Sequence, residues 1–181
     1  MNTRKLAMTS VMAALMCLAG MMVHWVSPAL VPFSVLPVLV LMSGLILGAE
    51  YAAMATLVYL VLGLFGLPVF STAPFGGFGY ILKPTFGFLI GNVAAAYVVG
   101  RVYRKGSLKW AIIGVLAGIA TLYLFGLSYL YIILQWVVHS PTSIAGVIMI
   151  GFVPFILGDL IKAAIAVWVG QEVVRRRSKA T

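Results

Sequence analysis

Long apolar segments, separated by short clusters of basic residues, are the feature that most restricts the fold of this 181-residue chain. Hydrophobic residues make up 64% of it and charged residues only 8%, whereas soluble domains carry about 25% charged residues. So few polar side chains could not cover its surface in water. Because backbone groups in lipid must be hydrogen-bonded within the chain, the sequence predicts an all-α integral membrane protein with a single membrane domain, residues 1–181.

The basic clusters decide how many times we expect the chain to cross the membrane. The apolar stretch at residues 37–66 is long for one span and short for two. If it forms two helices that turn near Glu50, ten of the twelve Lys and Arg residues fall on one side. Positive charge is typical of cytoplasmic connections. We therefore expect a compact bundle of six transmembrane helices with both termini cytoplasmic, spanning residues 6–26, 37–49, 50–66, 85–102, 108–136 and 153–174.

The first apolar segment has the basic start of a signal peptide, but its length of about 20 residues and the lack of a cleavage site favour a retained span. Small residues at four-residue spacing let helix backbones approach closely in a membrane. We expect most such pairs to pack within the bundle, and we regard the pair on the first helix as a candidate docking surface for another membrane subunit. The pairs are Gly44 and Gly48, Gly87 and Gly91, Gly114 and Gly118, and, on the first helix, Ser10 and Ala14.

Two charged residues, Asp159 and Lys162, lie inside the last apolar segment. Their spacing of three places them on one helix face, roughly 9 and 13 Å from the outer end of the helix at a rise of 1.5 Å per residue. A charge within the membrane costs at least about 2.5 kcal/mol. A structural ion pair is one explanation. We favour a polar binding site that opens toward the outer side.

The expected outer connections at residues 27–36, 67–84 and 137–152 are rich in Gly and Pro, whereas the inner ones are short and basic. Residues 71–80 combine flexible glycines with Phe75, Phe78 and Tyr80, and such a loop can fold over a small flat ligand. Lys83 follows this loop, either as an interfacial anchor or as a pocket residue that attracts a carboxylate. The outer side is thus the expected site of recognition.

Several catalytic signatures are missing from the sequence. It has no phosphate-binding G-x-x-x-x-G-K-[ST] motif, no H-E-x-x-H and no cluster of Cys and His. Three acidic residues and two histidines are few for a membrane enzyme, and the single Cys17 is expected to be a small buried hydrophobe. We therefore expect no enzyme activity, no metal site and no resident cofactor.

Three segments resemble the BioY family, the biotin-specific S-components of energy-coupling factor (ECF) transporters. They are Gly-Leu-Ile-Leu-Gly at residues 44–48 with the stretch that follows to residue 70, Gly-Gly and Lys-Pro-Thr-Phe-Gly-Phe at residues 76–77 and 83–88, and Pro-Phe-x-x-Gly-Asp-x-x-Lys at residues 154–162. The last of these is the most specific. The similarity extends from about residue 31 to the tail.

The chain departs from the family pattern at three positions. Leu36 stands where the family usually has Gln, and Lys83 and Phe86 replace two glycines. These changes alter the polarity of the expected pocket, and they leave open another small carboxylate-bearing vitamin or cofactor as the ligand. A membrane enzyme or accessory protein that uses Asp159 and Lys162 is a third, different class of function.

The resemblance implies a function and a set of partners. Such a subunit binds biotin from outside and associates with a membrane coupling protein and two ATP-binding cassette ATPases in the bacterial cell membrane. It is thought to topple in the membrane to release the ligand inside. Ser10 and Ala14 would be the docking surface for the coupling protein. The implied ligand-binding residues are Asp159, Lys162, Lys83, Ser34, Phe75, Gly76, Gly77, Tyr80 and Phe88.

Overall fold

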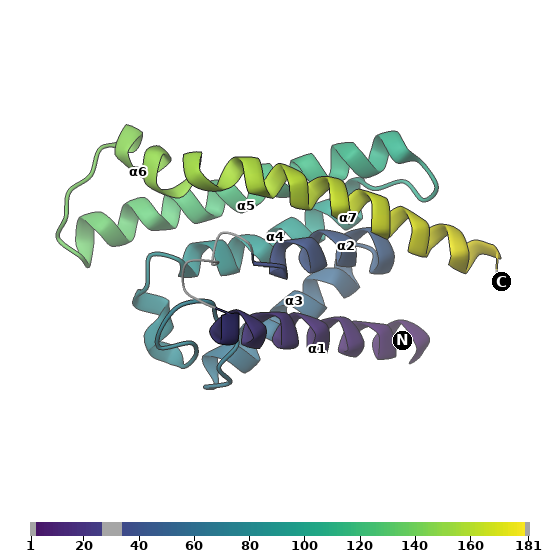
Figure 1. Ribbon diagram of the computed structural model, residues 1–181, viewed down its shortest axis with the longest axis horizontal. Helices are drawn as coiled ribbons and strands as arrows, with labels where there is room; N and C mark the ends of the chain where they lie inside the picture. Colours follow the sequence, from purple (N-terminus) through teal and green to yellow (C-terminus); the bar gives the residue numbers. More distant parts are fainter. Residues whose placement is uncertain (1–2, 27–33, 180–181) are drawn as a thin grey trace.

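Helices form almost all of the regular structure in the computed structural model, which describes residues 3–26 and 34–179 (Figure 1). This agrees with the all-α expectation, because an apolar chain satisfies its backbone hydrogen bonds most simply within helices. The elements are α1 (Thr3–Val26), α2 (Leu36–Leu47), α3 (Ala49–Leu64), the 3-10 helix η2 (Phe78–Leu82), α4 (Phe86–Val102), α5 (Leu108–Trp136), α6 (Ile144–Gly151) and α7 (Val153–Lys179).

Six of these helices, α1 to α5 and α7, occupy the six apolar segments of the sequence. The connection expected at residues 137–152 is not all loop, since it contains α6, so the described residues form seven α-helices rather than six. Ser143 caps α6, its side chain accepting a hydrogen bond from the Gly146 N–H. Most of the connection expected at residues 27–36 lies outside the described residues. Three helices, α1, α5 and α7, are long and apolar enough to cross a membrane, while α2, α3 and α4 are apolar but shorter.

The apolar stretch at residues 37–66 breaks at a single residue, Gly48, close to Glu50, near which the turn was expected. Gly48 has φ +83° and ψ 173°, a conformation that costs little only for glycine. Glu50 lies in the first turn of α3. The break turns the chain, so that α3 leaves in a new direction (Figure 1).

Close packing between α4 and its neighbours depends on small residues. A Cβ atom at Gly91 would lie 2.8 Å from the Leu122 carbonyl oxygen on α5, and one at Gly44 on α2 would lie 3.0 Å from the Ala96 carbonyl oxygen on α4. Neither backbone can move aside without shifting a helix. These glycines therefore pack within the bundle, as the four-residue spacing predicted.

The helices do not all contact one another. Both α4 and α7 pack against α2 and α5, while α4 and α7 make few or no contacts with each other. On the other side of the bundle, α1 packs against α2 and α3. A cavity lies in the space between α4 and α7.

The loop between α3 and α4 is held by its own hydrogen bonds. Val69 and Phe70 are completely buried, and the Val69 carbonyl accepts a 3.0 Å hydrogen bond from the Tyr59 hydroxyl. The Phe70 N–H donates to the Phe75 carbonyl at 2.8 Å, and the Gly77 N–H donates to the Gly63 carbonyl at 2.7 Å. The loop is therefore an ordered part of the fold that ends at the start of α4.

Candidate ligand-binding site

A cavity of about 340 Å³ lies between α4, α5 and α7 and reaches the loop that precedes α4. Small-molecule sites commonly have volumes of about 300–1,000 Å³ and mostly apolar walls with a few polar groups. This cavity fits that description. Its lining residues are Ser34, Leu36, Pro37, Ser71, Thr72, Tyr80, Pro84, Thr85, Phe88, Leu89, Asn92, Leu122, Tyr123, Leu130, Ile150, Gly151, Phe155, Asp159 and Lys162.

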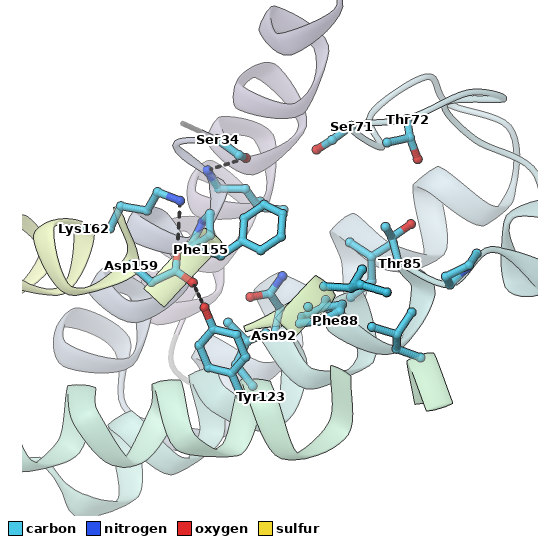
Figure 2. Close-up of a pocket in the computed structure, with 18 of the residues that line it drawn as sticks. Ser34, Ser71, Thr72, Thr85, Phe88, Asn92, Tyr123, Phe155, Asp159 and Lys162 are labelled. Atoms are coloured by element: carbon cyan, nitrogen blue, oxygen red, sulfur yellow. Dashed lines mark hydrogen bonds and ion pairs between the residues drawn. The ribbon is translucent and has the colours of Figure 1, made fainter. Parts of the chain in front are cut away.

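Asp159 is the centre of the polar part of the cavity (Figure 2). Its Oδ1 accepts a 2.9 Å hydrogen bond and ion pair from Lys162 Nζ, and its Oδ2 accepts a 2.5 Å hydrogen bond from the Tyr123 hydroxyl. The side chains of Lys162 and Asp159 are only 12% and 11% exposed. A buried charge needs such partners. Tyr123 therefore holds the carboxylate on α7 from the neighbouring helix α5.

Helical spacing brings the lining residues of α4 and α7 onto one face of each helix. On α7, Phe155, Asp159 and Lys162 are separated by four and three residues. On α4, Phe88 and Asn92 are four residues apart. Residues at these intervals are neighbours on a helix surface, so the two helices present facing stripes to the same space.

A group of hydroxyls forms the part of the lining nearest the loop. The Tyr80 hydroxyl is within 2.8 Å of Thr72 Oγ1 and accepts a 3.1 Å hydrogen bond from Thr85 Oγ1. Tyr80 is 2% exposed, and its ring lies 4.4 Å from that of Phe70, centroid to centroid. Ser34 Oγ accepts from the Leu36 N–H at 3.4 Å. In Figure 2, Thr72 and Thr85 lie on the side of the cavity away from Asp159 and Lys162, whereas Ser34 lies near Lys162.

The residues expected at the site fall into two groups. Ser34, Tyr80, Phe88, Asp159 and Lys162 all line this one cavity. Leu36, which stands where the family usually has Gln, also lines it. The structure therefore brings together residues from four separate stretches of the chain.

Four other expected residues, Lys83, Phe75, Gly76 and Gly77, are not among the lining residues. Lys83 and Phe75 are exposed. A Cβ atom at Gly76 would lie 2.5 Å from the Leu67 carbonyl oxygen, and Gly77 has φ +89°. Both glycines thus shape the loop backbone and do not form the cavity wall. Ser10 and Ala14 are exposed on α1, away from the cavity.

Five polar residues of the lining were not predicted as site residues from the sequence: Ser71, Thr72, Thr85, Asn92 and Tyr123. Asn92 had a detectable signal, because it is an amide inside an apolar segment and lies seven residues after Thr85 on the same helical face. Tyr123 had none, since tyrosines are common in this chain and its role depends on the contact between α5 and α7.

Comparisons with known proteins agree with this architecture. The model of the BioY family matches residues 1–179. A probable biotin transporter BioY of Lysinibacillus sphaericus is 35% identical over 87% of this chain and 80% of its own. The biotin transporters BioY of Thermotoga maritima and Rhizobium etli are 36% and 32% identical, over 78% and 96% of this chain and 81% and 95% of theirs.

A solved structure has the same fold. The crystal structure of the S-component for biotin from an ECF-type ABC transporter superposes with a TM-score of 0.75 and covers 96% of this chain and 92% of its own, at 20% sequence identity. At that identity the match concerns the fold alone. The match of the family model along nearly the whole length, together with these relatives, shows that the chain belongs to the BioY family.

Proposed function

We propose that this protein captures biotin from the outer side of the membrane, as the substrate-binding component of an ECF-type importer. The observation that carries the proposal is the apolar cavity whose polar groups include the Asp159 carboxylate, held by Lys162 and Tyr123. Biotin has a flat ring with urea N–H and C=O groups and an apolar chain that ends in a carboxylate. The family membership and the names of the relatives support the same ligand.

The lining offers a partner for each part of this ligand. Asp159 would accept from a urea N–H, and Lys162 would donate to a carbonyl or carboxylate oxygen. Phe88 and Tyr80 would contact the apolar ring and chain, while Ser34 adds a hydroxyl. Phe75, Gly76 and Gly77 would act indirectly, by shaping the loop.

Lys83 is exposed directly before the lining residue Pro84. In this position its ammonium group would attract an approaching carboxylate without contacting the bound ligand. The role that we propose for Lys83 is therefore in ligand capture.

Equilibrium binding of biotin to the detergent-purified protein tests this proposal, with lipoate and thiamine as competitors. We expect tight binding of biotin that neither competitor displaces at similar concentration, and recovery of the ligand chemically unchanged. Failure of the folded protein to bind biotin would refute the proposal. Tight binding of lipoate would favour another carboxylate-bearing vitamin, and a chemically altered ligand would favour an enzyme.

The topology that we propose has six spans, α1 to α5 and α7, with both termini in the cytoplasm. The basic residues between α4 and α5 and those of the tail then lie on the cytoplasmic side, and α6 lies on the outer side. A Cys17→Ala background, which removes the one cysteine, allows single cysteines to be placed at Phe78 and Lys105. In intact cells we expect a membrane-impermeant maleimide to label Phe78→Cys and not Lys105→Cys, and the reverse pattern would refute this topology.

The partners that we propose are a membrane coupling protein and two ATP-binding cassette ATPases, in a bacterial cell membrane. ATP hydrolysis would take place on those chains, because this one has no phosphate-binding motif. Ser10 and Ala14, exposed on α1, would form the docking surface for the coupling protein, since small residues allow close approach of a second helix.

A further inference from the structure

Asn92 is a buried amide whose hydrogen-bonding capacity is not met by the described part of the protein. It lies on α4 and is 5% exposed. Its side-chain Oδ1 is buried and has no hydrogen-bond partner among the described residues. Because it lines the cavity, the partner can come from whatever occupies that space.

The other buried polar side chains behave differently. Among the described residues, Thr9, Ser43 and Thr56 each donate to a carbonyl oxygen of their own helix, at 2.9, 2.7 and 3.0 Å. Asp159 is bonded to Lys162 and Tyr123. Buried polar groups in native proteins are nearly always hydrogen-bonded, and an unmet one destabilises the fold. An amide in this position therefore needs a partner that the described residues do not supply.

The position of Asn92 also indicates what kind of group it meets. Both oxygens of Asp159 already accept a hydrogen bond from the protein, whereas the amide oxygen of Asn92 accepts none. A carboxamide presents an acceptor beside an N–H donor, and its O and N atoms can exchange places by a flip. It is thus complementary to a ligand edge on which N–H and C=O are adjacent, as in an amide or a cyclic urea.

We propose that Asn92 is a ligand-binding residue that pairs with the N–H and C=O edge of a cyclic urea. This inference rests on the proposed function, because the ring of biotin carries such an edge. The urea would lie between α4 and α7, with Asn92 on one helix and the Asp159–Lys162 pair on the other (Figure 2). Asn92 then determines specificity for the ring, since a ring without a urea leaves the amide unpaired.

The variant Asn92→Leu tests the contact, because leucine is close to asparagine in size and cannot form hydrogen bonds. We expect the affinity for biotin to fall by about tenfold or more. The affinity for desthiobiotin, which keeps the cyclic urea, should fall by the same factor, whereas any weak binding of lipoate, which has no urea, should not change. The thermal unfolding midpoint of the ligand-free protein should stay the same or rise, because an unpaired buried amide is removed.

Ser43→Ala is a matched control, because it changes a buried polar side chain that is already bonded to Val40 and does not line the cavity. It should leave biotin affinity unchanged. Asn92→Ala provides a second variant that adds no bulk, in case the leucine prevents folding, and it should show the same selective loss.

The possible outcomes distinguish failure of the proposed Asn92 contact from failure of the proposed function. If the unaltered protein binds no biotin, the proposed function and this contact both fail. If it binds biotin tightly and the Asn92 variants bind equally well, the contact alone is refuted. An equal loss of affinity for biotin and lipoate, or a lower unfolding midpoint in both variants, would show that Asn92 serves packing and would also refute the contact.

Discussion

Replacing Asp159 by Asn is expected to lower the affinity for biotin by about 100-fold, the largest effect of any single change in the cavity. The variant keeps the size of the side chain and removes its charge. A hydrogen bond to a charged group contributes about 1.5–3 kcal/mol, and each 1.4 kcal/mol is tenfold in affinity. The change also removes the carboxylate that forms an ion pair with the partly buried Lys162 ammonium, which disfavours the liganded arrangement further.

Titration calorimetry of the purified variant measures this loss. Tyr123→Phe gives a graded comparison, because it removes only the hydroxyl that donates to Asp159, and we expect an intermediate loss of about three- to tenfold. Glu50→Gln is a matched control that neutralises an exposed carboxylate on α3 outside the lining. Unchanged affinity in Asp159→Asn would mean that the carboxylate only stabilises the bundle.

Ala14→Trp on α1 is expected to reduce biotin uptake by the assembled transporter by about tenfold or more, while biotin binding by the isolated subunit stays the same. Ser10 and Ala14 are exposed, and the opposite face of α1, with Met12, Ala13 and Met16, is buried against the bundle. A large side chain on the exposed face would keep the backbone of α1 apart from that of the docking helix of the coupling protein. Overpacking of this kind typically costs about 1–3 kcal/mol, which would weaken the association of the two subunits.

Uptake of labelled biotin by cells that express all subunits, together with co-purification of the coupling protein, measures this effect. Ala120→Trp is the matched control, because it makes the same change at another exposed alanine, on α5, and should leave uptake unchanged. Normal uptake and co-purification with Ala14→Trp would place the docking surface elsewhere. A parallel loss of biotin binding would instead indicate that α1 had shifted within the bundle.

The features that were predictable from the sequence have local causes. The helical segments followed from apolar runs, since helices satisfy the backbone in lipid. Asp159 and Lys162 were found because charges within an apolar segment are costly and rare. The internal packing of Gly44 and Gly91 followed from the spacing of small residues.

The remaining features depend on contacts between distant parts of the chain. Tyr123 matters only because α5 places its hydroxyl against Asp159 of α7. The separation of Gly76 and Gly77 from the cavity depends on how the loop folds onto Gly63 and Leu67. The Gly- and Pro-rich composition around α6 gave no indication of a helix there. These contacts join segments that are distant in the sequence. A motif or a hydrophobic period within one segment therefore cannot predict them.

The charged groups of the described cavity lining sum to zero, so the charge of the ligand sets the net charge of the occupied site. Among the described lining residues only Asp159 and Lys162 are charged, and they cancel. A ligand that carries one negative charge therefore gives the occupied site a net charge of −1. Moving that charge toward a cell interior that is electrically negative costs about 2.3 kcal/mol per 100 mV. In the import that we propose, the resting membrane potential would thus oppose inward release, and the proposed ATPase partners would have to do electrical work in addition to the work of concentrating the ligand.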